Sequence, residues 1–459
     1  MVKCNMKKFR ILAAVLLVCL TAGAWTAWAG RYSSRETSFQ ALWDKAKGYA
    51  EEELYQKAAE TYENALALKD DPSLRAEQLQ AYENGYHAGV ISKKTYINAL
   101  TQASSQAPKN AVYWEKIISV HMENNEYSDA YKACKNAARA GAKSEALDSL
   151  LNTVTYSYKI KSKVYRTAFL STAGYYTVFD GTHWGVLSPA GDSWVYDCVY
   201  RYISPVGADG SVYIETVGDS ENTDSEADEE KRTAYLADKT DRIQAYVNFG
   251  SKLCRAASER YVPVSANGTW SYFDCENGAF LPEIYEDASA VSGTTAAVKE
   301  NGRWHLKDLS DNTSIGTDFD DIRLFENGEY LYDEKMLAAE NGVYALYNIS
   351  GKKLAELPGK TTDVYRGGLI AFQAESGLWG YADTKGKTII EPQFEGAKSF
   401  SGGLGAVCID GKWGFLSEKG QIVIECTYLD VGYFNQNGVC FVSLTEGEYF
   451  PIVLRFPQK

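Results

Sequence analysis

The sequence has few of the residues from which most catalytic and metal sites are built. Only 4 His occur among 459 residues, and the 9 Cys are isolated, with no Cys-x-x-Cys pair. A zinc cluster is not expected, because zinc sites use closely spaced Cys and His ligands. The chain also lacks a P-loop, a Gly-x-Gly-x-x-Gly fingerprint, a Gly-x-Ser-x-Gly elbow and a His-Glu-x-x-His pair. We therefore predict no catalytic, cofactor-binding or metal-binding residues.

An excess of positive charge is also absent. The formal net charge is -13 at pH 7, from 47 basic and 60 acidic residues. Because such a chain repels phosphate backbones, nucleic acid is not expected as a partner. The composition otherwise suits a folded protein of two or three domains, with 45% hydrophobic and 13% aromatic residues. Its 33 Tyr and 10 Trp favour half-buried β surfaces and recognition faces.

The N-terminus carries an uncharged apolar run. Residues 1–10 contain four basic residues and no acid, and the 19 residues 11–29 follow without a charge. A helix of that length just spans a bilayer core of about 30 Å, and the basic flank stays in the cytoplasm. We therefore predict a cytoplasmic segment, a transmembrane or signal-anchor helix, and a single-pass membrane protein whose bulk lies outside the cytoplasm. The alternative is secretion after cleavage near Ala29, where the sequence fits a signal-peptidase site.

Residues 39–161 have the Ala-rich spacing of helical repeats. The pattern Tyr-x-x-Ala-x-x-x-x-x-x-Ala begins at Tyr55 and again at Tyr127, 72 residues later, and Pro72 and Pro108 lie 36 residues apart. A fixed period of this size indicates a repeat. The pattern resembles the tetratricopeptide repeat family, whose small residues stand where helices cross closely. The resemblance implies a solenoid of stacked helix pairs, which would serve as a packing spacer or offer a peptide-binding groove.

Beyond residue 165 the sequence changes to short alternating segments in which one aromatic position recurs. The units that begin GLWGYADTKGKTIIEPQF and GKWGFLSEKGQIVIECTY place Trp379 and Trp413 34 residues apart. The recurring aromatics are Trp184, Tyr235, Trp270, Trp304, Tyr344, Trp379 and Trp413, at spacings of 51, 35, 34, 40, 35 and 34, with a partial match at Tyr449. A glycine follows three of them, namely Gly185, Gly380 and Gly414. We predict that each ring packs under the next unit and that each glycine admits a close backbone.

This array resembles the WG-repeat family, whose units run Trp-Gly-aromatic, a glycine turn, an aliphatic pair and Pro-x-aromatic. The resemblance implies a β-repeat binding or surface module without catalytic residues. Asn-Gly and Asp-Gly pairs before most of the aromatics predict tight hairpins, and we expect three strands in each unit, with Pro392 ending one of them. Seven repeats and a leftover strand over 165–457 favour a closed seven-bladed β-propeller, in which that strand completes the first blade. An open β-solenoid is the alternative. Residues 219–230 are predicted to be an acidic loop insertion within the array.

Taken together, the sequence predicts an α + β multidomain chain with a transmembrane helix, a helical solenoid and an all-β repeat array. The predicted function is an extracytoplasmic, membrane-anchored scaffold that binds a protein or a cell-wall glycan of the envelope, without catalysis and without a cofactor. The alternative is a carbohydrate-active, glycoside hydrolase-like propeller, in which Asp318, Asp320 and Asp321 would have to converge with a distant acid. The partner, the disulfide pairing and the oligomeric state are left open.

Overall fold

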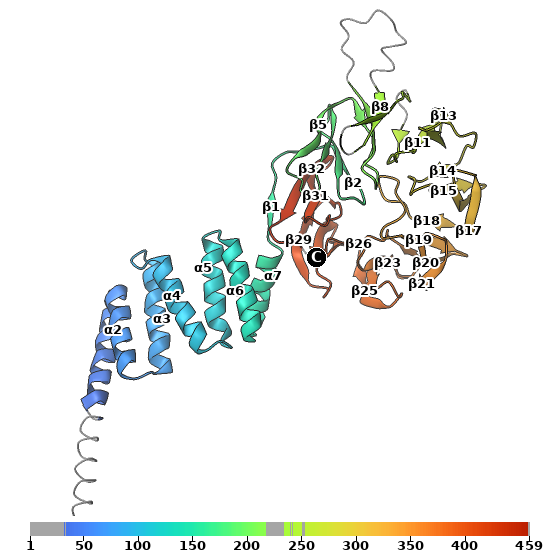
Figure 1. The fold of residues 1–459 in the computed structure, drawn as a ribbon. Coiled ribbons are helices and arrows are strands. Elements are labelled where there is room, and N and C mark those ends of the chain that lie inside the picture. The colour runs from blue at the N-terminus through green and yellow to red at the C-terminus, as the bar shows by residue number, and fades with distance from the viewer. Residues whose placement is uncertain are drawn as a thin grey trace, which may run out of the picture. The chain divides into compact units, whose positions relative to one another are not determined.

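The chain folds into two compact units. The computed structural model describes residues 32, 34–216, 234–238, 240, 242–249 and 253–457. The units are Met1–Val154, whose described residues are mostly helical, and Thr155–Lys459, whose described residues are built mainly from strands (Figure 1). The predicted membrane helix, 11–29, and the acidic insertion, 219–230, both lie outside the described residues.

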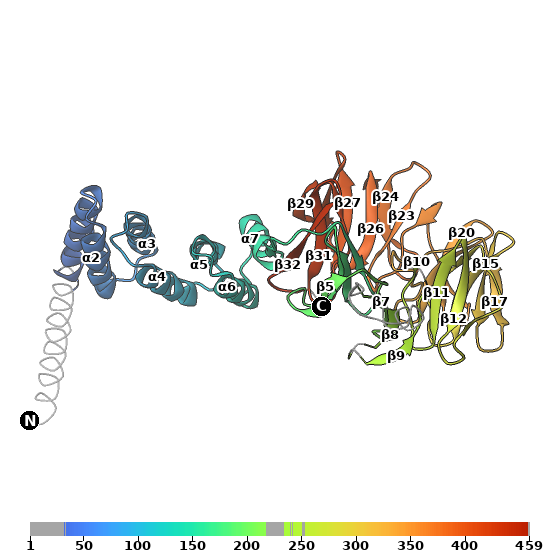
Figure 2. The ribbon, with the colours of Figure 1, turned by 90° about the horizontal axis from the view of Figure 1, so that it is seen from above.

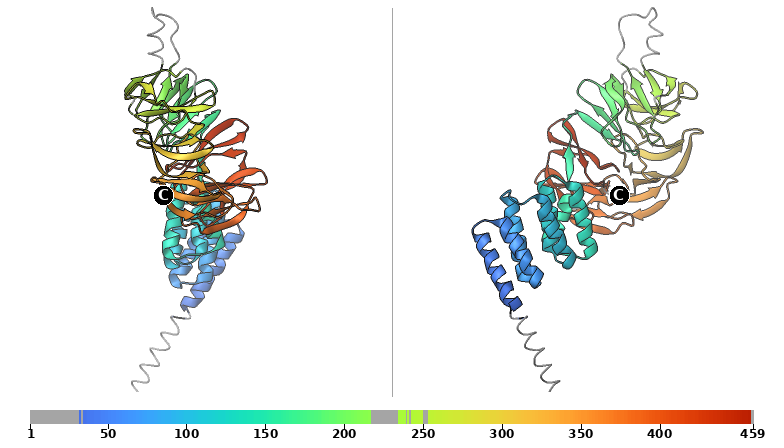
Figure 3. Two further views of the ribbon diagram at one scale, coloured as in Figure 1. Left: turned by 90° about the vertical axis from the view of Figure 1, so that its right-hand side faces the viewer. Right: turned by 60° about the vertical axis from the view of Figure 1, so that its left-hand side comes forward.

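The first unit is a row of antiparallel helices. After helical residues 34–51, its helices are α2 (Tyr55–Leu68), α3 (Pro72–His87), α4 (Lys93–Gln106), α5 (Ala111–Glu123), α6 (Tyr127–Ala140) and α7 (Glu145–Thr155). Consecutive helices from α2 to α6 pack against each other, and the views agree on their order (Figure 2, Figure 3). The N-terminus of α3 is capped by Asp71, whose side chain accepts hydrogen bonds from Ser73 N and Leu74 N.

The repeated alanines of the helical unit stand at its helix contacts. Ala58 and Ala65 in α2, like Ala130 and Ala137 in α6, are each 0% exposed. A methyl group at these sites lets two helices approach closely, which explains why the pattern recurs with alanine. The helical repeat is therefore present, while its resemblance to the tetratricopeptide family stays a prediction.

The predicted membrane location of the chain requires a correction. Across the residues that the structure describes, each helix is either too short or too polar to traverse a bilayer. The predicted single-pass membrane location has no support from that finding, and membrane anchoring forms no part of the function proposed for this chain.

The second unit consists of four-stranded antiparallel sheets, which we number as blades 1 to 8 in chain order. Blade 1 contains β2 (Thr167–Leu170), β3 (Tyr176–Phe179), β4 (Trp184–Leu187) and β5 (Trp194–Tyr200). Blade 2 contains β6 (Tyr202–Ile203), β7 (Val212–Glu215), β8 (Ala234–Ala237) and β9 (Ile243–Tyr246). Blade 3 contains β10 (Leu253–Cys254), β11 (Tyr261–Ala266), β12 (Thr269–Asp274) and β13 (Ala279–Phe280). Blade 4 contains β14 (Asp287–Ala288), β15 (Thr295–Glu300), β16 (Arg303–Asp308) and β17 (Thr313–Phe319).

The remaining blades repeat this order of strands, and the last one also takes a strand from the start of the unit. Blade 5 contains β18 (Asp321–Ile322), β19 (Lys335–Glu340), β20 (Val343–Asn348) and β21 (Lys353–Glu356). Blade 6 contains β22 (Thr361–Thr362), β23 (Ile370–Gln373), β24 (Trp379–Ala382) and β25 (Thr388–Phe394). Blade 7 contains β26 (Gly396–Ser401), β27 (Leu404–Ile409), β28 (Lys412–Leu416) and β29 (Ile422–Tyr428). Blade 8 contains β30 (Asp430–Val431), β31 (Val439–Thr445), β32 (Glu448–Leu454) and, as its fourth strand, β1 (Tyr158–Ile160).

The predicted seven-bladed propeller is therefore wrong: the described residues form eight blades. The leftover C-terminal strand, β32, does not complete the first blade, because it is the third strand of a blade of its own. The fourth strand of this blade is β1, from the start of the unit. It pairs with β32 in antiparallel register, with Lys159 opposite Val453. The array is also closed, since the Tyr176 hydroxyl in β3 of blade 1 donates a hydrogen bond of 2.8 Å to Val439 O in β31 of blade 8 (Figure 1).

The strand count within a unit also differs from the expectation. Each blade has four strands and not three, because a short first strand such as β22 precedes the pair of strands around the hairpin. Pro392 does not end a strand, since β25 continues through it to Phe394. The proline is tolerated because β25 is at the edge of its sheet. The predicted hairpin chemistry is confirmed: Asn301 and Gly302 both have positive φ, 51° and 74°.

Candidate functional site

The recurring aromatics occupy one equivalent position in every blade, the third strand. Trp184, Tyr235, Trp270, Trp304, Tyr344, Trp379, Trp413 and Tyr449 lie in β4, β8, β12, β16, β20, β24, β28 and β32. Several rings contribute to hydrophobic clusters that continue into the following blade. Trp304 is 4% exposed and packs with Ile322 and Met336 of blade 5, and Trp184 meets Tyr202 of blade 2 edge-on at 5.6 Å. These rings hold neighbouring blades together, which is a structural role.

The glycine after three of these rings faces the fourth strand of its own blade. A Cβ atom at Gly380 would lie 2.6 Å from the Ile390 carbonyl oxygen, and one at Gly414 would lie 2.5 Å from the Ile424 oxygen. A Cβ atom at Gly185 would lie 2.8 Å from the Cα atom of Cys198. The fourth strands carry extra residues at this point, as the register shifts show. Only glycine fits under such a bulge.

The acids considered for glycoside hydrolysis do not converge on a cavity. Asp320 pairs with Arg303 and accepts a 2.8 Å hydrogen bond from Gly342 N. Asp321 accepts a 2.7 Å hydrogen bond from the Tyr344 hydroxyl, and Asp318 contacts His305 Nδ1 at 2.7 Å. These partners tie the acids to neighbouring strands of blades 4 and 5.

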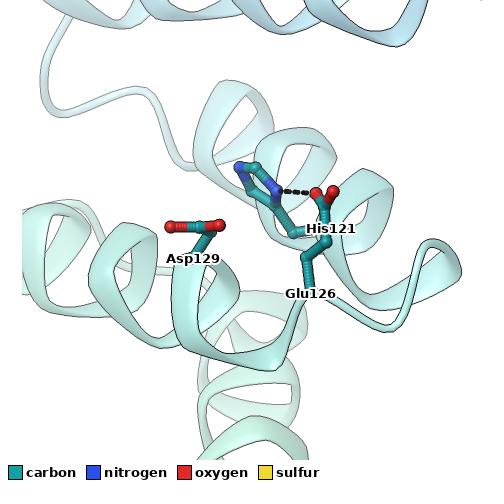
Figure 4. A group of neighbouring side chains, drawn as sticks. All are labelled: His121, Glu126 and Asp129. Atoms are coloured by element: carbon teal, nitrogen blue, oxygen red, sulfur yellow. Dashed lines mark hydrogen bonds and ion pairs between the residues drawn. The ribbon is translucent and has the colours of Figure 1, made fainter.

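A cluster of metal-ligand type is present in the helical unit. His121 Nδ1 lies 2.8 Å from Glu126, and these two residues and Asp129 offer ligand atoms within 4.8 Å of one another (Figure 4). However, Lys93 binds Glu126, and the pKa of that carboxyl is lowered first by this lysine and then by His121. Lys132 likewise binds Asp129 at 2.9 Å and lowers the pKa of its carboxyl. A cation would have to displace both ammonium groups, so the arrangement is better explained as an ion-paired cluster.

A different set of residues meets at the centre of the propeller. Residues 323–334, which we call the plug loop, connect β18 to β19 in blade 5. Asn327 O accepts a hydrogen bond of 2.9 Å from Ala256 N of blade 3, and Glu329 accepts one of 2.7 Å from Thr172 N of blade 1. Blades 1, 3 and 5 are not neighbours in the ring. Direct bonds among them are possible only near its axis, so the plug loop lies at the centre.

Glu329 is the buried acid of the plug loop. It is 6% exposed, and its carboxylate oxygens accept hydrogen bonds from Thr172 N, from Thr172 Oγ1 and from Asn327 Nδ2, at 2.7, 2.9 and 2.7 Å. Burial raises the pKa of this carboxyl, while the hydrogen bonds from Asn327 and Thr172 act in the opposite direction. The carboxyl thereby ties the plug loop to blade 1.

Arg366 is the buried cation beside it. This residue follows β22 in blade 6, is 5% exposed, and its Cζ atom lies 4.5 Å from the ring centre of Phe325 and 4.6 Å from that of Tyr433. Its Nη2 donates a long hydrogen bond of 3.4 Å to Leu170 O. Its Nε is buried and has no hydrogen-bond partner among the described residues. Two aromatic faces therefore hold the guanidinium in place and leave most of its donors unused.

Asp363 and Tyr433 complete the polar part of this centre. The Tyr433 hydroxyl lies 2.8 Å from both carboxylate oxygens of Asp363, and Ser399 N donates to the same carboxylate at 2.6 Å. Burial, followed by the neighbouring Asp363 charge, raises the pKa of the Tyr433 phenol well above its ordinary value. The phenol therefore stays a hydrogen-bond donor to Asp363.

A cavity of about 560 Å³ opens beside Arg366. It is lined by Tyr332, Arg366, Gly367, Gly368, Phe400, Ser401, Gly402, Gly403, Glu418, Gln436 and Asn437. A second cavity of about 210 Å³ shares Tyr332, Arg366, Ser401, Gln436 and Asn437 with it and reaches the turn of blade 1 at 170–174. Most of the lining comes from the turns between the first and second strands of blades 5, 6, 7 and 8.

Glycine shapes these turns because the blades crowd together here. A Cβ atom at Gly367 would lie 2.8 Å from the Tyr332 ring, and one at Gly368 would lie 2.5 Å from Phe400. Gly402 has φ 58°, and a Cβ atom there would lie 2.5 Å from the Asn435 oxygen. Side chains at these positions would push adjacent blades apart, so the glycines let the turns approach and form the cavity wall.

The sequence interpretation missed this centre, although one signal for it was present. The interval from Trp304 to Tyr344 is 40 residues, whereas the intervals on either side of it are 34 and 35. The additional residues form the plug loop. Arg366 and Glu329 carried no such signal, because their burial depends on turns from blades that are distant in sequence.

A smaller cleft of about 230 Å³ lies in the helical unit, between α2, α3 and α4. Its lining includes Glu63, Arg75, Tyr82 and Asn98. This cleft is the place where the peptide-groove alternative for the helical repeats would apply.

Comparisons with known proteins agree with the repeat assignment at the C-terminal end. The WG containing repeat family matches residues 379–413 and 413–449. No curated protein matches the sequence. Many solved structures show a likeness, and the TM-scores of those described next are low.

Three of these structures illustrate the range of TM-score, sequence identity and coverage. A variant of KlHsv2 with loop 6CD replaced by a Gly-Ser linker has a TM-score of 0.33 and 8% identity, over 62% of this chain and 92% of that chain. Kluyveromyces lactis Hsv2 has a TM-score of 0.29 and 13% identity, over 40% of this chain and 67% of that one. The Sgt2 TPR domain from Aspergillus fumigatus has a TM-score of 0.20 and 19% identity, over 25% and 76%. The family match and the topology together show that this chain is a β-propeller repeat protein with WG repeats at residues 379–449.

Proposed function

We propose that the protein is a binding scaffold that recognises a protein partner through the cavity at the centre of its propeller, without catalysis. The observation that carries this proposal is the cavity of about 560 Å³ beside Arg366. Its volume lies in the range of ligand sites, about 300–1,000 Å³. Its walls are turns fixed by hydrogen bonds and close packing across blades, so the site is largely formed before a ligand arrives.

The lining favours a protein over a glycan. Sugar rings pack their C–H faces on flat aromatic faces, but Phe400 is 1% exposed, and the Tyr332 ring lies against Gly367 and meets the Tyr365 ring in a T-shaped contact at 6.2 Å. The remaining wall consists of glycine backbone, the Ser401 hydroxyl, the amides of Gln436 and Asn437, the Glu418 carboxyl and the Arg366 guanidinium. Backbone groups and amides match the alternating donors and acceptors of a peptide.

The carbohydrate-active alternative receives no support from this cavity. A retaining or an inverting glycosidase needs two carboxyl groups on either side of the scissile bond. Within the described residues, Glu418 is the carboxyl group of the cavity lining. Asp318, Asp320 and Asp321 are engaged in blades 4 and 5 and are not part of that lining.

The test compares two tryptophan substitutions in the full-length protein. Asn437 is exposed and lines both central cavities, so Asn437→Trp should fill the site and weaken capture of a partner about tenfold or more. Lys385 is exposed in a turn of blade 6 and lies outside both linings, so Lys385→Trp should leave capture unchanged. Partners captured by the wild type and by each variant are quantified by mass spectrometry. Equal capture by Asn437→Trp and Lys385→Trp would contradict a binding site in this cavity.

A further inference from the structure

The donors of Arg366 point to the chemistry of the ligand. A guanidinium carries five N–H donors in a planar fork. At Arg366 the hydrogen bond within the protein is a single long contact to Leu170 O, and the buried Nε has no partner in the described part of the chain. Leaving a buried charged donor unpaired is costly, and such a group normally has a partner. The cavity that Arg366 lines is the place from which a partner can approach.

The nearby carboxylates do not take the role of that partner. Glu329 is held by Thr172 and Asn327. Asp363 is held by Tyr433 and by Ser399 N. In the described residues no hydrogen bond or ion pair joins Arg366 to either acid or to the exposed Glu418 of the cavity lining, although the Arg366 charge acts to lower the pKa of Glu329. Its own acids are therefore committed to other donors, and the planar fork stays available.

The guanidinium is also fixed before a ligand binds. Phe325 of the plug loop and Tyr433 of blade 8 lie against it at 4.5 and 4.6 Å. A planar fork held between two rings loses little conformational entropy when it binds a group of matching geometry. The group that matches a guanidinium fork is a carboxylate, which accepts two parallel hydrogen bonds.

We propose that Arg366 binds a carboxylate of a peptide ligand in the central cavity. This inference rests on the proposed function, because it names the chemistry of the ligand for the same site. The carboxylate comes either from the C-terminus of the peptide or from an acidic side chain, and both sources place the same two oxygens against the guanidinium.

The test measures the binding of defined peptides to the full-length protein by calorimetry. The probes are a library of N-acetylated tripeptides with free C-termini, the same library with C-terminal amides and no acidic residue, and an amidated library that contains Asp or Glu. Binding of the free acids alone assigns the C-terminal carboxylate, and binding of the acidic amides assigns the side-chain carboxylate. Equal binding of the neutral amides, or no binding by any library, overturns the proposal. Tighter binding of oligogalacturonate than of every peptide overturns the peptide assignment.

Variants then assign the effect to Arg366. Arg366→Met keeps the length of the side chain and removes the charge, and it should weaken acid binding about 10- to 100-fold. Because Arg366 is buried, its replacement can also change the stability of the fold. A second pair of variants therefore changes the exposed Gln436, which lines the same cavity. Gln436→Glu should weaken binding of the acid and Gln436→Lys should strengthen it, whereas equal affinities in this pair would overturn the proposal.

The same variants separate the two proposals. If Asn437→Trp abolishes partner capture while Arg366→Met and Gln436→Glu leave it unchanged, the cavity binds a partner but the carboxylate assignment fails. If Asn437→Trp has no effect on capture, the proposed function itself fails.

Discussion

The guanidinium of Arg366, in blade 6, lies over the ring of Tyr433, in blade 8, with Cζ 4.6 Å from the ring centre. These two blades are not neighbours, so the contact crosses the inner part of the ring. Together with the plug loop, it converts the middle of an eight-bladed propeller from an open channel into a packed polar centre. The cavity beside Arg366 is therefore bounded by residues that also hold the ring together, which explains why its walls are well defined.

The buried carboxyl of Glu329 should make stability depend on pH. Burial raises the pKa of this group above its ordinary value of 4.5, so the folded state favours the protonated form. Its stabilising contribution is complete below pH 4.5 and is lost as pH rises through the folded pKa. Glu329→Gln should flatten this part of the profile because an amide does not titrate. The variant can keep the contacts, since its carbonyl oxygen can accept from Thr172 N and Asn327 Nδ2 while its amide donates to Thr172 Oγ1.

The measurement is the free energy of unfolding in urea for the wild type and for Glu329→Gln, from pH 4.5 to pH 7. The free energy of unfolding of the variant, relative to that of the wild type, should increase as pH rises. A constant difference between the two proteins would show that Glu329 titrates alike in the folded and unfolded states.

The glycine after a signature tryptophan should be intolerant of even a methyl group. In Gly414→Ala the new Cβ would lie 2.5 Å from the Ile424 oxygen and 2.7 Å from Cys426 N, both of which are backbone atoms. We expect a loss of about 1–3 kcal/mol, the usual cost of overpacking. Gly432→Ala is the control, since its nearest neighbour, the Phe441 oxygen, lies at 3.4 Å. Thermal unfolding that moves equally for both variants would contradict the proposed role of Gly414.

The strand that closes the eighth blade should matter for the whole propeller. Lys161 N donates a hydrogen bond of 2.9 Å to Pro451 O next to the pairing of β1 with β32. Lys161→Pro removes this donor and should destabilise the protein by about 1–3 kcal/mol. Lys161→Ala keeps the backbone N–H and serves as the control, because the Lys161 side chain is exposed. Denaturant midpoints that coincide for the two variants would show that β1 contributes no closure.

The described cysteines should be unreactive in the folded protein. Six of them, Cys134, Cys198, Cys275, Cys408, Cys426 and Cys440, are free thiols. Burial raises the pKa of Cys134 and of Cys198 to about 11 and that of Cys275 to about 12. Because the thiolate is the reactive form, these groups should react slowly with Ellman's reagent at neutral pH.

Denaturation in guanidinium chloride should release the same thiols for rapid reaction, and the difference between the two rates is the quantity to measure. Rapid reaction of the native protein would contradict the burial of these groups. Cys440, which is 0% exposed, should be the slowest of the set.

Much of the propeller could be predicted from local patterns. Trp379 and Trp413 returned at a constant interval because each repeat places its ring in the same strand and against the same kind of neighbour. The Asn-Gly hairpin at Asn301 could be predicted equally well, because the positive φ angles of a tight turn restrict the residue types at Asn301 and Gly302. The number of blades was predicted wrongly because the last aromatic, Tyr449, was assigned to a leftover strand: its blade takes its fourth strand, β1, from the start of the domain, and no local pattern near Tyr449 shows this.

The sequence by itself determined the period, the hairpin turns, the paired helices and the scarcity of catalytic residue types, since each of these depends on contacts between residues close along the chain. Only the tertiary structure decided that Tyr158–Ile160 completes a sheet with the C-terminal strands, and that Arg366, Glu329 and Tyr433 meet. The physical reason is ring closure. When the last blade reaches the first, turns that are up to hundreds of residues apart are forced onto one axis, and no local pattern records which side chains will meet there.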